Sequence, residues 1–319
     1  MGIDSSNCKS IETTEPVKFE SKRLINDFIF YTISVFIGLL VIAFSFDAPL
    51  DLIAERWPVF LTAIVAAAVA NATAVGGGFI FMPLFSMGYG FSSLESLKLA
   101  LATQAFGMTS GALAWSIKRI VISILGFSLV FAITGMIVGS FYISPDQNYI
   151  DIAFGAASLG LAVILAVEVY YSKKNSREVE IRTPTTADLI VFAVLCLLGG
   201  MINAWVSIGI GEIVALWMLL RWKYPLALCI STGVAALAGC SIAGLLIHSE
   251  LGGIRWDFLA FTAPGVVIGG RLGARLGVVI CGDTREETKA KNFNSGDRLK
   301  HFIIVVIFVD GIAVLFNAL

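Results

Sequence analysis

Two hydrophobic runs in this chain are too long to cross a lipid bilayer once as straight helices. They cover residues 57–94 and 189–220. As continuous helices they would measure about 57 Å and about 48 Å at the usual rise per residue, against a hydrocarbon core of about 30 Å. Tilting a helix does not absorb such an excess. Each run is therefore predicted to break and fold back within the membrane.

The remaining hydrophobic runs have ordinary spanning length and lie at 24–46, 96–117, 120–142, 150–172, 224–247, 256–280 and 300–318. The mean hydropathy is +0.88 and only 14% of residues are charged. This pattern predicts an all-α polytopic membrane protein with about seven full spans and two broken-helix hairpins. We expect a disordered cytoplasmic tail at 1–23, an additional N-terminal transmembrane helix at 24–46, and two repeats at 57–172 and 189–318, each a hairpin plus three spans.

Glycine clusters mark the predicted breaks. The first long run contains Gly76, Gly77 and Gly78 followed by Pro83, and the second contains Gly209 and Gly211. Glycine and proline both weaken a helix interior. An Asn-Ala pair precedes each break, and the related stretches "LALATQAFGMTSGA" and "LALCISTGVAALAG" follow them. The chain is thus predicted to contain a weak internal repeat.

The distribution of basic residues favours two hairpins over simple crossings. With a cytoplasmic N-terminus and both long runs folding back, only Arg56, Lys98 and Arg255 of the 22 Lys and Arg residues lie outside. Other arrangements place many more outside, against the positive-inside rule. The two hairpins then enter from opposite sides, so the repeats have inverted topology. Such repeats are typical of secondary transporters, and we expect a multi-pass protein of the cell (inner or plasma) membrane.

A helix broken in mid-membrane exposes backbone N–H groups and a positive dipole end, and glycine lets a ligand approach them. This predicts a binding site for a small anion. The alternative is that the small residues serve only close helix packing, and that the two arginines only anchor a span. The candidate substrate-binding residues are Asn71, Gly76, Gly77, Gly78, Thr103, Gln104, Asn203, Gly209, Gly211, Ser231, Thr232, Arg271 and Arg275.

Two acidic residues lie inside hydrophobic runs, where an ionisable group is a functional candidate by default. Glu212 sits at the second break, and Asp310 lies midway along the last run. Either could carry a coupled proton. Glu212 could instead cap a half-helix, and Asp310 could form a structural pair with a basic residue.

Several function classes are excluded or disfavoured. There is no basic patch with interleaved aromatic residues, so no nucleic-acid partner is expected. The two histidines lie far apart and none of the five cysteines forms a CxxC pair, so neither a metal ion nor a cofactor is expected. No nucleophile with a neighbouring base is evident, so the chain is not predicted to be an enzyme. The expected partners are a small anion and the lipid bilayer. The oligomeric state stays open, with a homodimer as one option.

The stretches "AVGGGFIFMPLF", "LATQAFGMTSGALA", "GIGEIVALWML" and "PGVVIGGRLGARLG" resemble the TauE/SafE family of membrane permeases over about residues 55–319. The resemblance implies export of sulfite or of an organosulfonate such as sulfoacetate. The second glycine element departs from the family's G-x-G-G-G pattern, because Glu212 follows Gly209-Ile210-Gly211. We read the chain as a secondary transporter that works by alternating access. Alternatives are a passive anion channel, or a permease for another sulfur-containing or carboxylate anion.

Overall fold

The computed structural model describes residues 21–115, 119–143, 146–174 and 182–281, with isolated positions between 304 and 316. These residues are helical, with no strand among them. The elements are α2 (Ser21–Ser45), α3 (Pro49–Thr73), α4 (Gly78–Pro83), the π-helix η1 (Leu84–Gly88), α5 (Ser93–Trp115), α6 (Ile122–Tyr142), α7 (Gln147–Lys174), α8 (Thr186–Val206), α9 (Ile210–Leu220), α10 (Leu226–Leu251) and α11 (Trp256–Cys281).

Within the described residues, five helices are long and apolar enough to cross a membrane: α2, α3, α6, α8 and α10. Helix α5 is of similar length but carries more polar residues, and it is buried along most of its course. Its polar side chains therefore contact protein rather than lipid. Most of the tail 1–23 and most of the span expected at 300–318, with Asp310, lie outside the described residues.

Both long hydrophobic runs break at the predicted glycines. Helix α3 ends at Thr73 and α4 begins at Gly78, while α8 ends at Val206 and α9 begins at Ile210. The first residue after each long helix, Ala74 or Ser207, has a left-handed backbone with φ of 58° and 57°. A side chain disfavours this conformation, so two such residues at matching places indicate that surrounding contacts hold both turns.

Each broken run returns to the end from which it started. Near the start of α3, the Arg56 guanidinium lies 4.2 Å from the centre of the Phe258 ring, and Tyr89, just after η1, packs on the same ring at 5.0 Å. At the other hairpin, Arg221 follows α9 and its Nε donates to Asp188 Oδ1 at the start of α8, at 2.7 Å. The chain therefore reverses direction at both breaks.

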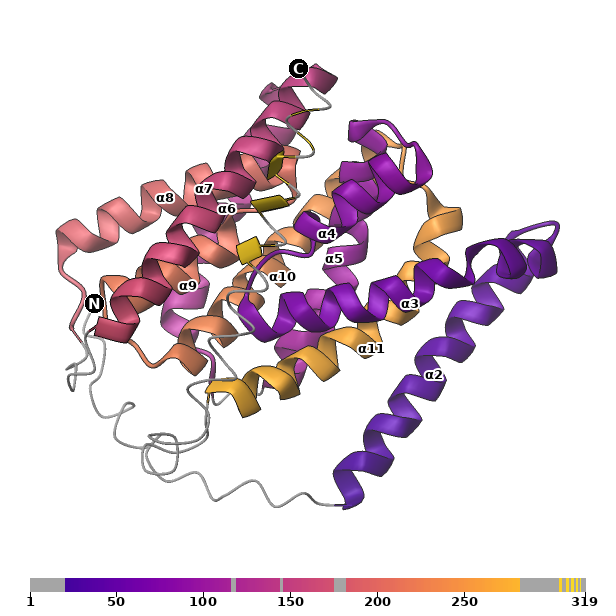
Figure 1. Cartoon of the computed structure of the whole chain (residues 1–319), viewed down its shortest axis with the longest axis horizontal. Helices are drawn as coiled ribbons and strands as arrows, with labels where there is room; N and C mark the ends of the chain where they lie inside the picture. The colour runs from indigo at the N-terminus through magenta and orange to yellow at the C-terminus, as the bar shows by residue number, and fades with distance from the viewer. Residues whose placement is uncertain are drawn as a thin grey trace.

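The long helices form two sets that run in opposite directions. Helices α3 and α11 lie side by side and run the same way (Figure 1), since Gly265 meets Phe60 and Gly273 meets Ala68. Helices α6 and α8 also run the same way, since Gly135 meets Leu197 and Gly139 meets Met201. So do α8 and α10, where Asn203 contacts Cys240 and Trp205 packs near His248. Helix α5 runs with α11 and against α10, as shown by the contacts of Gly107 with Val266, Gly111 with Gly270, Lys98 with Gly252 and Gln104 with Ser241.

Helix α2 lies at the edge of the molecule (Figure 1). It contacts α11, where Gly38 packs against Pro264. Elsewhere it exposes large apolar side chains, including Phe28 at 71% and Phe44 at 86%. In a membrane these side chains would face lipid, so α2 is an addition to the bundle rather than part of its centre.

Candidate functional site

The two breaks meet in the interior of the bundle, and we call residues 74–78 and 207–212 the crossing. The carbonyl oxygen of Ser207 lies against Gly78, so close that a Cβ there would overlap it. In the matching contact, the carbonyl oxygen of Ala74 lies against Gly211, 3.2 Å from where a Cβ would stand. Glycine at these two positions lets the backbones of the two hairpins touch.

One carboxylate joins the two breaks. The Gly76 backbone N–H donates to Glu212 Oε1 at 2.6 Å, and the Gly209 N–H donates to Glu212 Oε2 at 3.0 Å. The Glu212 side chain is buried, with the residue 6% exposed. Gly76 and Gly209 hold matching places, each two residues after the left-handed residue of its break. The negative group therefore receives N–H groups from both halves of the molecule, as favoured at helix N-termini.

Glu212 forms no salt bridge with any described basic residue. Its charge is balanced instead by backbone N–H groups and by the start of α9. A second anion placed about 4 Å from this carboxylate would be repelled by about 4 kcal/mol at an effective dielectric constant of 20. Two negative groups side by side at the crossing would therefore repel each other strongly.

Gln104 of α5 joins the crossing to α10. Its Oε1 accepts from the Gly78 backbone N–H at 3.2 Å and from the Ser207 hydroxyl at 3.3 Å. Its Nε2 donates to Ser241 Oγ at 3.0 Å. This amide is 2% exposed and has three hydrogen bonds in the buried interior. Gln104 therefore fixes α4, the second break and α10 relative to one another.

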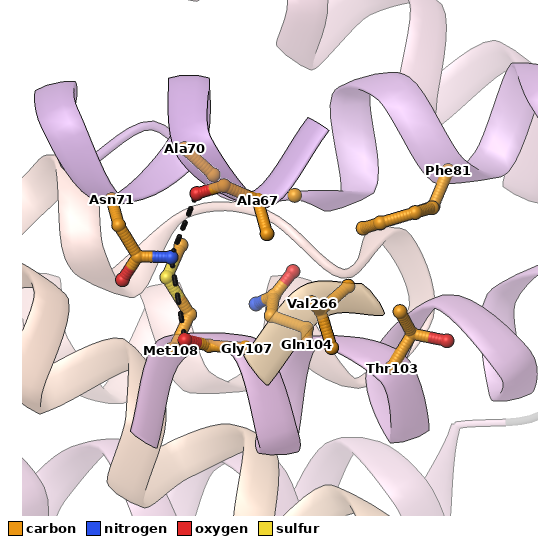
Figure 2. A pocket seen from close by; sticks show the side chains of 10 residues that line it. Ala67, Ala70, Asn71, Phe81, Thr103, Gln104, Gly107, Met108 and Val266 are labelled. Atoms are coloured by element: carbon orange, nitrogen blue, oxygen red, sulfur yellow. Dashed lines mark hydrogen bonds between the residues drawn. The ribbon is translucent and has the colours of Figure 1, made fainter. Parts of the chain in front are cut away.

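A small cavity lies beside the crossing, between α3, α4, α5 and α11. Asn71, Phe81 and Gln104 surround it (Figure 2), and Gly77 and Thr103 belong to its lining. Its volume of about 10 Å³ corresponds to roughly one water molecule. An oxyanion with several heavy atoms needs more room. The space beside the crossing is therefore too small for such a ligand in this conformation.

The two asparagines before the breaks hold helices together. Asn71 Nδ2 donates to the carbonyls of Ala67 and Gly107, at 2.9 and 3.3 Å (Figure 2). Asn203 Nδ2 donates to Cys240 Sγ at 3.6 Å. Both residues are at most 1% exposed. Each amide links a hairpin to the next long helix of its own half.

Thr103 also makes a contact between helices. Its hydroxyl pairs with Thr262 Oγ1 of α11 at 2.8 Å. The residue lines the cavity, but its polar atom is already engaged. It therefore contributes a hydrogen bond between α5 and α11 in this conformation.

Three further candidates, Ser231, Thr232 and Arg271, make contacts away from the crossing. Ser231 Oγ donates to the Arg119 carbonyl at 2.5 Å, and Thr232 Oγ1 accepts from the Val121 N–H at 3.1 Å. These hydroxyls hold the segment before α6. On α11, the Arg271 guanidinium stacks on Phe30 of α2 at 3.8 Å, and Arg275 follows one turn later on the same helix. The structure therefore does not bring Ser231, Thr232 or Arg271 together with the glycines, and Asp310 lies outside the described residues.

The contacts at the crossing align the two repeats in a different register from the one that the sequence suggests. Leu237 packs against Gly211, as Gln104 contacts Gly78. Aligning the two "LAL" stretches would instead pair Gln104 with Ser231. The shift explains why Ser231 and Thr232 lie elsewhere. It arises because α10 is buried on nearly all sides, so its small apolar residues carry no periodicity that sets a register.

Ser207 and Ser241 contribute to the crossing and were not among the sequence candidates. Ser207 supplies both a carbonyl and a hydroxyl at the second break, and Ser241 accepts from Gln104. Ser207 could have been found, because it lies between Asn203 and Gly209 at the end of a helix. Ser241 has no local signal in the sequence.

Comparison with known proteins identifies the family of the chain. The family model described as sulfite exporter TauE/SafE matches residues 59–285, more than half of the chain. The chain belongs to the TauE/SafE family. The resemblance stated from the sequence motifs is thereby confirmed. Comparisons with curated proteins and with solved structures give no match.

Membership in the TauE/SafE family, together with the apolar helices, makes the protein a multi-pass membrane protein of a transporter family. The matched region contains both breaks, Gln104 and Glu212, but only the last part of the match reaches beyond α11. Helix α2 lies before the matched region. The crossing thus lies within the region that the family model matches.

Proposed function

We propose that the protein is a secondary transporter that exports a small oxyanion, such as sulfite or an organosulfonate, by alternating access. Membership in a family named for sulfite export supports the class of substrate. No ATP-binding motif occurs in the sequence, so the drive would come from an ion gradient or from the gradient of the anion itself. The substrate-binding position would be the crossing, with Gly76, Gly209 and Gln104 around it.

The observation that carries this proposal is the convergence of N–H groups from two separate breaks on one negative group. Half-helix N-termini that point at an anionic group near mid-membrane are a device of secondary transporters. The small volume of the cavity beside the crossing supports a carrier, because a channel would need a wider, continuous path.

Transport can be tested with purified protein in liposomes loaded with sulfite. We expect the rate of sulfite efflux to reach a plateau at high sulfite concentration. Sulfoacetate should compete with sulfite. Liposomes without protein give the background. Large currents that do not saturate would show a channel, and absence of flux for sulfite, sulfoacetate, taurine, sulfate and thiosulfate would reject this substrate class.

We also propose that the two halves are inverted repeats and that the two hairpins enter from opposite sides of the membrane. The opposite directions of α5 and α10, and of the helices packed beside them, support this arrangement. The basic residues further support a cytoplasmic N-terminus, since Arg56, Lys98 and Arg255 all lie near the same end of the bundle.

This topology predicts opposite labelling of two exposed positions. Glu250, at the end of α10, is expected outside, and Thr183, before α8, is expected in the cytoplasm. In a background without the five native cysteines, Glu250→Cys should react with an impermeant thiol reagent added to intact cells. Thr183→Cys should react only after the membrane is opened. Reaction of both from one side would contradict the two-hairpin topology.

Glu212 is our candidate for proton coupling. Protonation would neutralise this carboxylate and so let it leave the crossing before a substrate anion enters. We predict that transport by the wild-type protein depends on pH and that Glu212→Gln loses most of this dependence, because glutamine keeps the size but cannot ionise. Flux measured across a series of pH values, with and without an imposed proton gradient, would check this. A Gln variant with the wild-type pH profile would leave Glu212 as a helix cap.

A further inference from the structure

The two halves of the crossing match in their backbone but differ in one side chain. Glu212 comes three residues after Gly209, and its counterpart, three residues after Gly76, is Phe79. Phe79 is 1% exposed and packs near Phe154 of α7, with ring centres 6.0 Å apart. The Gly76 and Gly209 N–H groups, one from each break, therefore both donate to a side chain of the second half. The following inference rests on the proposed function.

The carboxylate occupies the place that a bound anion would need. Its two oxygens take the Gly76 and Gly209 N–H groups, at 2.6 and 3.0 Å. A sulfite, sulfonate or free carboxylate also has two oxygens on one central atom and can accept from the same pair of donors. The side chain and such a ligand present the same chemistry to the same N–H groups.

Both cannot be present together. The neighbouring cavity has space for about one water molecule. Leu237 and the carbonyl of Ser207 close around Gly76 on the other sides. The charge of the carboxylate is not offset by any salt bridge among the described residues, so a second anion beside it would be repelled.

We propose that the Glu212 carboxylate is a tethered competitor that fills the anion position of the substrate-free protein, and that a small oxyanion binds by displacing it. Displacement also removes the bridge that this carboxylate makes between Gly76 and Gly209. A ligand that bridges both N–H groups keeps them joined. Ligands with two oxygens on one centre are therefore favoured over a halide, which offers a single acceptor atom.

Removing the competitor should leave an open anion site. We expect Glu212→Ala to bind sulfite or acetate at least tenfold more tightly than the wild-type protein, measured as the anion concentration that gives half of the maximal rise in melting temperature. Sodium chloride at the same ionic strength should give no such rise. Glu212→Gln should fall between the two, because its amide keeps one oxygen acceptor at the crossing.

Glu95 provides a matched control. Its carboxylate accepts from the Ser92 backbone N–H at 3.1 Å, three residues earlier, as Glu212 does from Gly209. It caps a single helix and bridges no second hairpin. Glu95→Ala should therefore leave the binding of acetate and sulfite at the wild-type level.

The possible results decide the matter. An Ala variant that binds sulfite and acetate no more tightly than wild type, or no better than chloride, overturns the proposal. Should that variant not fold, the Gln variant is decisive, and affinity equal to wild type overturns it. Tight acetate binding by the Ala variant with no sulfite flux by the wild type supports the competitor and rejects the proposed transport. Sulfite flux with unchanged binding in both variants supports transport and rejects the competitor.

Discussion

Replacing Gly78 with alanine is expected to abolish transport and to lower the melting temperature of the purified protein. A Cβ at this position would overlap the backbone carbonyl of Ser207. Backbone atoms cannot turn away as a side chain does, so the second hairpin would have to move. Overpacking of a tight interior costs about 1–3 kcal/mol, and more where backbone must shift. The loss of stability should appear together with loss of flux, because the same contact aligns the two breaks.

Three other glycines provide a graded comparison for this variant. At Gly211 the nearest atoms to an added Cβ include two backbone carbonyl oxygens at 3.2 Å, so alanine there should have an intermediate effect. At Gly77 the close neighbour is the Phe81 ring at 3.2 Å, which can rotate, so Gly77→Ala should be milder. Gly160 of α7 has nothing within 4 Å of that position, and alanine there should be neutral or stabilising. A Gly78 variant that behaves like the Gly160 variant would contradict the close approach of the breaks.

The sequence predicted the breaks correctly because their signals are local. The length of the two runs and the glycines within them are visible without knowledge of partners. The return of each hairpin was predicted from the positions of basic residues, and the contacts of Arg56 with Phe258 and of Arg221 with Asp188 agree with it. Bilayer thickness and charge placement constrain whole segments, so their effects can be predicted from the sequence.

The side-chain contacts at the crossing could not be predicted in the same way. Glu212 was expected either to cap its own half-helix or to carry a proton, and its contact with Gly76 of the other hairpin has no signal in the sequence. Arg271 was a candidate for the site because arginine matches the geometry of an oxyanion, yet it stacks on Phe30 of α2. In both cases the partner comes from a distant segment. In buried helices such as α10, small residues on every face leave the rotation of the helix undetermined by pattern alone.

Replacing Gln104 with methionine should destabilise the protein far more than the removal of a neighbouring hydroxyl. Methionine keeps the length and the unbranched shape of glutamine but can replace none of its hydrogen bonds. The Gly78 N–H, the Ser207 hydroxyl and the Ser241 hydroxyl would each lose a contact. A buried polar group left without a partner costs about 1–3 kcal/mol. We expect Gln104→Met to lower the stability several times more than Thr103→Val does, and to slow sulfite flux.

Thr103→Val is the matched control for Gln104→Met, because Thr103 is the preceding residue of α5 and loses one contact, with Thr262. The Thr262 hydroxyl keeps the carbonyl of Leu259 at 3.4 Å, so the control should cost only about 0.5–1.5 kcal/mol. A double-mutant cycle then locates the effect. In a Ser241→Ala background, Gln104→Met should cost less than in the wild type, since one of the contacts is already gone. If the changes in melting temperature of the two single variants add without coupling, Gln104 does not connect the crossing to α10. The contact between the two hairpins would then have to be held by Glu212 and the glycine contacts alone.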